Sequence, residues 1–391
     1  MGFLFGVFFF IHLLKEQGFA MEKAKDLKQE IGILEQRISE LEDRLNKSDY
    51  NGVVRFQDKK LENIMLKEMK KHKLIPENQF YITRDEAKKF NTKHDRLWIL
   101  DSGITSLYGL EHFVHITRIY IHRNFIRDLT PLASLEKLEK LYCCDNHITD
   151  ITPISYCEKL EEVSLSGNMI ENISPLSKLE NLEYLDIDDN CVEDLTPLSS
   201  CKKLSVLHAS KNVIADLTPL KQLPLVELEL DDNFLHDISP LENISGLTNL
   251  SLSKNSISDI NPLRNKKELE ALDLDLNDIS DISPLVDSYK LEFLSIARNH
   301  VKDIKPLVKH NILNFYASMQ TLRGIDPFVF PKGYRFKVLK GDSKTEDGKT
   351  IYSEDSIIEF NYEGKRYSID YDRFGHTHHG FIERGSYEHK N

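Results

Sequence analysis

The stretch "LEYLDIDDNCVEDLTPL", Leu182 to Leu198, decides the fold, because its pattern recurs along most of the chain. Its asparagine and its proline return every 22 residues, with single steps of 21. The asparagines stand at 124, 146, 168, 190, 212, 233, 255, 277 and 299, and the prolines at 131, 153, 175, 197, 219, 240, 262, 284, 306 and 327. A fixed period of this size is typical of a repeat protein, so stacked units are expected.

Each unit is expected to begin with a short strand and to turn at the asparagine. In the quoted unit Leu185 and Ile187 alternate with polar residues, which is the period of a strand with one buried face. One unit cannot bury its leucines alone, so the units must stack into a parallel-stranded solenoid. The amide of Asn190 has two donors and an acceptor, and stacked copies would satisfy turn groups that are otherwise buried unpaired.

The second half of the unit predicts one short helical turn. Ser, Thr, Asn or Asp precedes the proline in every unit except the one with Lys305. This pattern predicts Thr196 as a helix N-cap, with Pro197 at the first helical position. Few residues remain before the next strand, so the turn is expected to be 3₁₀.

The unit L-x-x-L-x-L-x-x-N-x-I-x-D-I-x-P-L resembles the leucine-rich repeats of the bacterial internalin family. The resemblance covers residues 94–328 and implies an α/β solenoid of short parallel strands and 3₁₀ turns that binds a protein without catalysis. The first unit has Ser102 and Gly109 in the asparagine and proline columns, and the last has Gln320, so both look like end caps. The period also resembles that of eukaryotic phosphatase-binding repeats, which leaves a regulatory or scaffold subunit of an enzyme as an alternative.

The resemblance and the composition together divide the chain into five parts. We expect an apolar N-terminus (1–20), a helical, coiled-coil segment (21–72), an N-terminal cap (73–93), the repeats (94–328), and a small β region with a polar tail (329–391). The apolar run 2–14 is shorter than a membrane-spanning helix needs. A membrane anchor through residues 1–14, a signal peptide and a misplaced start codon are all compatible with it.

A heptad of apolar residues runs through 24–45 and fits a homodimeric coiled coil or an amphipathic helix packed on the body of the chain. In the C-terminal region the alternating, Tyr- and Ile-rich residues predict a β hairpin or small sheet. Within it, "SKTEDGKT" (343–350) approaches a phosphate-binding loop, but the following β-like run favours a polar hairpin. An enzymatic or nucleotide-binding role for this region stays open as a second alternative.

Metal chemistry and redox chemistry receive little support. The string from Asp273 through Asp275 to Asn277 opens like a calcium loop, but Asp278 and Pro284 replace the glycine and the glutamate that such a loop needs. We therefore expect no metal site and no cofactor. The five cysteines lack zinc spacing, and free buried thiols fit a cytoplasmic or membrane-anchored protein better than a secreted one.

The outward strand positions would line one continuous concave surface. Its candidate partner-binding residues are Trp98, Tyr120, His122, Tyr142, Asp186, Asp188, Glu229, Asp231, Asp273, Asp275 and Tyr316. Aromatic residues stand toward the ends and acidic pairs alternate with small residues between them. With a formal net charge of -12, concentrated in the repeats, the chain does not suit nucleic acid. A protein partner with exposed Lys or Arg suits it, although a solvated face alone would explain the same charges.

Overall fold

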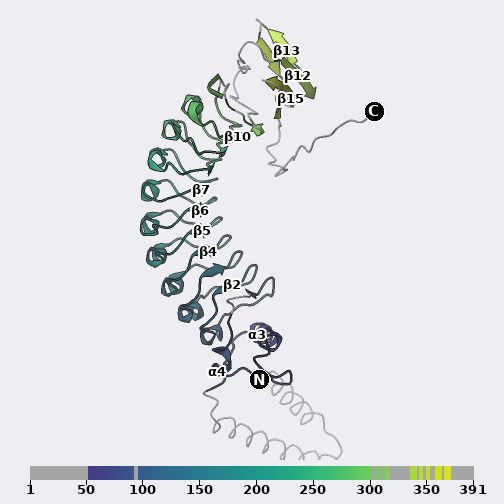
Figure 1. The fold of residues 1–391 in the computed structure, drawn as a ribbon, viewed down its shortest axis with the longest axis vertical. Helices are drawn as coiled ribbons and strands as arrows, with labels where there is room; N and C mark the ends of the chain where they lie inside the picture. The colour runs from purple at the N-terminus through teal and green to yellow at the C-terminus, as the bar shows by residue number, and fades with distance from the viewer. Residues whose placement is uncertain are drawn as a thin grey trace, which may run out of the picture.

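The computed structural model describes residues 52–91 and 96–301, short pieces between 305 and 316, and strands between 335 and 370. The repeats form a curved stack, with strands along the concave side and helical turns along the convex side (Figure 1). Eleven parallel strands make one sheet, in chain order. They are β1 (Leu97–Trp98), β2 (Arg118–Tyr120), β3 (Lys140–Tyr142), β4 (Glu162–Ser164), β5 (Tyr184–Asp186), β6 (Val206–His208), β7 (Glu227–Glu229), β8 (Asn249–Ser251), β9 (Ala271–Asp273), β10 (Phe293–Ser295) and β11 (Asn314–Tyr316).

Neighbouring strands pair without slippage, so equivalent residues lie side by side. Leu185 pairs with Leu207, and Asp186 pairs with His208. The inward positions, such as Leu185 and Ile187, are completely buried and join one hydrophobic core along the stack. The predicted parallel solenoid is therefore confirmed for the described repeats.

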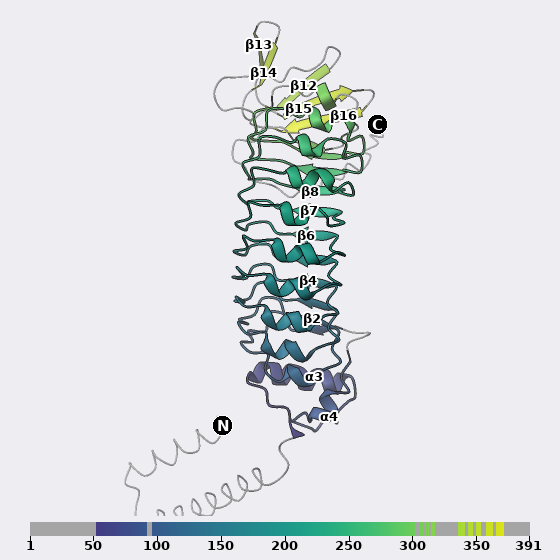
Figure 2. The ribbon, with the colours of Figure 1, turned by 90° about the vertical axis from the view of Figure 1, so that its left-hand side faces the viewer.

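The convex side carries the short 3₁₀ helices, which follow one another along the stack (Figure 2). They are η2 (Leu110–His112), η3 (Thr130–Ser134), η4 (Thr152–Tyr156), η5 (Ser174–Lys178), η6 (Thr196–Ser200), η7 (Thr218–Leu220), η8 (Ser239–Asn243), η9 (Asn261–Leu263), η10 (Ser283–Asp287) and η11 (Lys305–Leu307). The 3₁₀ geometry matches the expectation from loop length.

The predicted capping residue was wrong. Thr196 lies inside η6, the flanking residue is Leu195, and neither provides the cap. Instead Asp194, two residues before Thr196, accepts a hydrogen bond from the Thr196 backbone N–H at 2.8 Å. The same contact recurs in other units, for example from Thr218 to Asp216 at 2.8 Å. The carboxylate can reach back over one residue because an Asx turn forms ahead of the helix.

The asparagine column is a continuous ladder of side-chain hydrogen bonds. Asn212 donates to the carbonyl of Ile187 in the previous unit at 2.9 Å, and to those of Ala209 and Ser210 in its own unit. Its carbonyl oxygen accepts from the backbone N–H of Val192 at 2.9 Å. Each amide thus satisfies backbone groups of two units, as predicted.

A residue with left-handed backbone conformation precedes each asparagine and makes the turn. In chain order these residues are Arg123, Asp145, Gly167, Asp189, Lys211, Asp232, Lys254, Leu276 and Arg298. All but the glycine hold a conformation that side chains disfavour. The ladder therefore stabilises a strained turn as well as pairing polar groups.

The N-terminal cap is built from two helices that share the core of the repeats. Helix α3 (Lys59–Lys71) buries Leu61, Met65 and Met69, one turn apart. Asp58 caps α3 and also accepts a hydrogen bond from the Thr105 backbone at 2.8 Å, which ties the helix to the first unit. Helix α4 (Arg84–Ala87) starts with a capping box formed by Thr83 and Glu86. The sequence-based division placed 59–71 with the coiled-coil segment, but these residues pack as part of the cap.

Gly109 replaces the proline of the first unit for a steric reason. Its φ of 113° lies in the left-handed region, and a Cβ there would come within 2.4 Å of the Phe56 ring. Phe56 belongs to an aromatic cluster with Phe113 and Phe90 under the cap. The glycine therefore lets the cap close over the end of the stack.

The C-terminal region contains the expected β structure. Strands β12 (Arg335–Lys340), β15 (Ile357–Tyr362) and β16 (Lys365–Asp370) form an antiparallel sheet, and β13 (Ser343–Glu346) pairs with β14 (Lys349–Tyr352). The phosphate-loop-like string thus spans a hairpin, without the helix that phosphate binding requires.

The apolar N-terminus and the heptad segment 24–45 lie outside the described residues. Within the part that the structure describes, no helix is long and apolar enough to cross a membrane.

We expect Asn212→Ala to lower the free energy of unfolding by roughly 2–4 kcal/mol, because it leaves buried backbone groups of two units without partners. Chemical denaturation followed by circular dichroism measures the loss. Val213→Ala, at the neighbouring side chain that is 41% exposed, is the matched control and should change stability little. Equal losses in the two variants would show that the ladder is not the stabilising element.

Candidate functional site

The concave face consists of three columns of side chains, of which the sequence interpretation recognised two. The second column holds Trp98, Tyr120, Tyr142, Ser164, Asp186, His208, Glu229, Ser251, Asp273 and Ser295, and the third holds Leu100, His122, Cys144, Ser166, Asp188, Ser210, Asp231, Ser253, Asp275 and Ala297. The first column, which was missed, holds Arg96, Arg118, Lys140, Glu162, Tyr184, Val206, Glu227, Asn249, Ala271 and Phe293. Counting two residues back from the second column finds it, because strand side chains alternate.

The N-terminal end of this face is an aromatic stack. Trp98 and Tyr120 stack with ring centroids 4.3 Å apart, and Tyr120 and Tyr142 stack at 4.7 Å. The parallel register places these rings on adjacent strands at equivalent positions. Trp98 is 46% exposed at the end of the stack. The structure thus brings three of the predicted aromatic residues together, and His122 lies beside two of them.

Cationic side chains from the first column border the aromatic stack. The Arg96 guanidinium lies 5.7 Å from the Trp98 ring centroid and 5.4 Å from that of Tyr120. Lys140 and the Tyr142 hydroxyl both donate to the carboxylate of Glu162. This end of the face is therefore aromatic and basic, a character that the two predicted columns alone did not reveal.

The central and C-terminal rows are acidic, and the carboxylates of their third-column residues accept hydrogen bonds from the next unit. Asp188 accepts from the Ser210 backbone N–H at 2.6 Å, Asp231 from that of Ser253 at 2.6 Å, and Asp275 from that of Ala297 at 2.6 Å. The three contacts are equivalent, because each joins a carboxylate to the backbone of the following unit.

Serines in the rows after two of the acidic rows donate hydrogen bonds to these carboxylates. Ser251 donates its hydroxyl to Asp231 at 2.6 Å, and Ser295 donates to Asp275 at 2.5 Å. The serines between acidic rows therefore have a structural role, in addition to keeping the acidic rows apart.

Burial and neighbouring carboxylates raise the pKa of several of these carboxyl groups. Burial raises the pKa of Asp188 to about 6, against the opposing effect of the Ser210 N–H. Burial likewise raises the pKa of Asp273 well above 3.8, and the charge of Asp275 raises it further. The pKa of Asp275 is also raised by burial, although its bonds to Ser295 and Ala297 oppose the shift.

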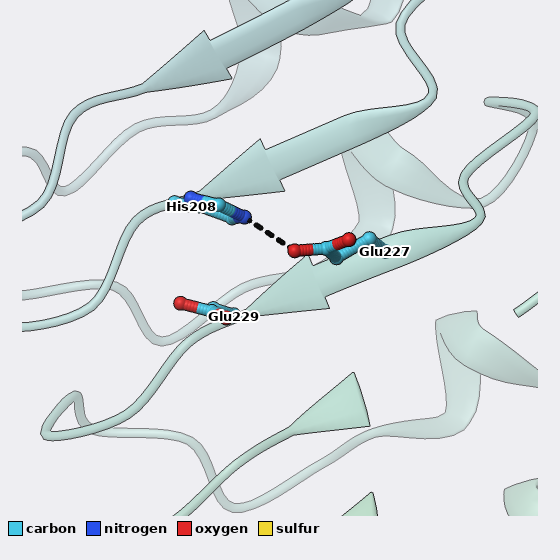
Figure 3. A group of neighbouring side chains, drawn as sticks. All are labelled: His208, Glu227 and Glu229. Carbon is cyan, nitrogen blue, oxygen red and sulfur yellow. Dashed lines mark hydrogen bonds and ion pairs between the residues drawn. The ribbon is translucent and has the colours of Figure 1, made fainter. Parts of the chain in front are cut away.

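His208 meets two glutamates at the middle of the face, as Figure 3 shows. Its Nε2 lies 2.8 Å from a carboxylate oxygen of Glu227, a first-column residue that the sequence interpretation did not single out. Burial lowers the pKa of His208, but the bond to Glu227 and the nearby carboxylates outweigh this and leave the pKa raised.

The remaining candidates are placed as follows. Asp273 and Asp275 face the concavity while Asn277 belongs to the ladder, so the calcium-like string does not converge on one point. Tyr316 lies in β11, whose side chains are outside the described set. Cys143, Cys157 and Cys201 are buried free thiols, as expected from the sequence.

The fold and the repeats are similar to those of known proteins. A family model described as "Leucine Rich repeats (2 copies)" matches residues 136–178 and 180–222. The solved structure of an internalin from Listeria monocytogenes is 29% identical, with a TM-score of 0.62, and the match covers 68% of this chain and 78% of that one. Internalin C2 from the same organism is 26% identical over 66% of this chain and 93% of that one, with a TM-score of 0.41. No curated protein sequence matches the chain.

The raised pKa values predict how stability depends on pH. A folded-state carboxyl that holds its proton more tightly than the unfolded chain loses its stabilising effect as the pH rises from 3.8 through the raised pKa. We therefore expect Asp273→Asn to raise the free energy of unfolding by about 1–2 kcal/mol at about pH 7.5 and to flatten its decline between acid and neutral pH. Asparagine keeps an oxygen that can accept the Asp275 N–H, as Asp273 does at 2.9 Å.

Denaturation curves at several pH values measure this dependence. Asp189→Asn is the control, because Asp189 is exposed and its left-handed backbone suits asparagine. An unchanged pH profile in Asp273→Asn would contradict the assignment of a raised pKa to this carboxyl.

Proposed function

We propose that this leucine-rich repeat protein of the internalin type is a non-enzymatic binding module that holds a protein partner on its concave face. Repeat solenoids of this class present extended concave surfaces for protein interaction. The observation that carries the proposal is the division of the face into an aromatic, basic end and an acidic remainder. A face selected for solubility alone would not need an exposed, stacked aromatic end.

The aromatic end supplies the anchor. Trp98 offers a large apolar surface that is half exposed, and Arg96 adds a planar cation beside it. Tryptophan, tyrosine and arginine dominate the energetic centres of protein interfaces because they bury much area at low entropic cost. An apolar or acidic segment of the partner fits this end.

The acidic remainder selects the other part of the partner. Asp186, Glu229 and Asp273 occupy the second column on strands β5, β7 and β9, where Ser and His residues separate them. Charges at this spacing attract a basic surface and accelerate its association, most strongly at low salt. We therefore infer a partner with Lys or Arg along one segment. A regulatory or scaffold subunit of an enzyme would use the same face and differs only in what is bound.

Two further expectations stay proposals, because they rest on residues outside the described part: membrane association through residues 1–14 and homodimer formation through 24–45. Neither is needed for binding on the concave face.

The binding face is tested first by photo-crosslinking in the source cell. A crosslinking amino acid at Ser251, on the concave side, should capture a protein that the same group at Ser177, exposed in the convex η5, does not. Mass spectrometry then identifies the partner. Capture from Ser177 alone would reject the concave face.

The affinity of the identified partner tests the chemistry. We expect the triple variant Asp186→Asn, Asp231→Asn and Asp273→Asn to bind about tenfold or more weakly at low salt, mainly through slower association, and the difference to shrink as salt is added. Glu136→Gln, Glu158→Gln and Glu180→Gln remove three carboxylates from exposed positions outside the three concave columns and form the control. The comparison is made at a pH above the raised pKa of Asp273, so that both triples remove the same charge. Equal effects of the two triples would mean that net charge, rather than the face, attracts the partner.

A further inference from the structure

His208, Glu227 and Glu229 form a cluster of three potential metal-binding side chains on two adjacent strands (Figure 3). His208 ends β6, and Glu227 and Glu229 begin and end β7. One ligand atom from each, the imidazole nitrogen and two carboxylate oxygens, lies within 4.8 Å of the others. The three atoms thus lie close together on two paired strands.

The strand register creates this convergence. His208 pairs directly with Glu229 across the two strands, and Glu227 stands two residues before Glu229 on the same face. The Tyr184 ring packs edge-on against the imidazole, with centroids 5.5 Å apart, and holds its plane from the preceding strand. A donor set fixed on strands and supported by packing is preorganised for a ligand.

The charge around the cluster favours a cation. On the strands β5 to β9, the three concave columns contain five carboxylates besides Glu227 and Glu229, and among these described positions no Lys or Arg. They are Asp186, Asp188, Asp231, Asp273 and Asp275. One imidazolium neutralises a single negative charge, and the raised pKa values of Asp188, Asp273 and Asp275 reduce the total further, but an excess of negative charge remains beside the donor atoms. Both Glu227 and His208 are partly solvent-exposed, which gives an ion access.

We propose that His208, Glu227 and Glu229 bind a divalent transition-metal cation of the Zn²⁺ type, with the coordination positions toward the concavity left to water. One nitrogen and two carboxylate oxygens are a donor set that Zn²⁺ accepts, and three protein ligands leave a position open. Ca²⁺ and Mg²⁺ prefer oxygen donors only, so the imidazole favours a transition metal over them.

A plain ion pair between His208 and Glu227 is the competing explanation, and Glu229 distinguishes the two. The hydrogen bond of 2.8 Å joins His208 to Glu227, whereas Glu229 acts on His208 through its charge. Metal binding needs the oxygen of Glu229 as a ligand. The isosteric Glu229→Gln therefore removes a metal ligand while it leaves the bond between His208 and Glu227 in place.

The test is a titration of the purified, chelator-treated chain with Zn²⁺, without any partner, so it is independent of the proposed function. The sequence also carries "HTHH" at 376–379, so every protein tested bears His376→Asn, His378→Asn and His379→Asn. We expect one Zn²⁺ per chain by calorimetry, a rise in melting temperature with Zn²⁺, and no comparable effect of Ca²⁺. Co²⁺ should give a visible spectrum from the same site.

Three variants complete the design. Glu229→Gln and His208→Asn should each weaken Zn²⁺ binding at least about tenfold, since even loss of an outer-shell group costs about that much. Glu193→Gln, at an exposed position away from the cluster, should bind as the reference does. Circular dichroism of the metal-free variants shows that they are folded. Absence of one-to-one binding in the reference, equal binding in Glu229→Gln, or equal competition by Ca²⁺ would each overturn the proposal.

Discussion

The structure depends on one constraint: each turn after a strand buries backbone groups that no neighbouring strand can reach, and an asparagine amide must pair them. Asn146, for example, donates to carbonyls of two units and accepts from the N–H of Ile126. Because the amide belongs to both units, the same bonds that close one turn also fix the distance to the next. Strand register, the continuous leucine core and the order of side chains on the concave face all follow from that repeat.

Because of this regular repeat, equivalent side chains of successive units lie side by side on the concave face. Stacking of Trp98 on Tyr120 and of Tyr120 on Tyr142 needs no loop of special shape, since equivalent positions in successive units already lie at ring-stacking distance. The acidic rows use the same geometry differently, because Asp188, Asp231 and Asp275 each hold the backbone one unit ahead. The acidic side chains of the face therefore also hold neighbouring units of the solenoid together.

The sequence predicted the strands, the ladder and the 3₁₀ turns, because each rests on contacts that recur at fixed spacing. It did not predict the capping residue. The residue before the proline was expected to be the cap, but Asp194 forms an Asx turn and accepts the hydrogen bond from the Thr196 backbone N–H. The first concave column was missed for a simpler reason. Residues such as Glu227 precede the first inward leucine of the strand, and the alternation of the strand was not extended back to them; the contact of Glu227 with His208 confirms that this position faces the concavity. Raised carboxyl pKa values depend on burial in three dimensions, which spacing does not encode.

The shortened unit between Asn212 and Asn233 shows how the chain length is adjusted. There the ladder contact reaches back 24 residues to Ala209, where the other units reach back 25, yet the bond length of 2.9 Å is unchanged. The residue that is lost lies on the convex side, between Leu220 and Leu225, so the concave register does not shift. This deletion is thus absorbed away from the concave face. A unit shortened in this way keeps its row on the concave face, and a gene that duplicates one period would add one row to that face while the other rows stay as they are.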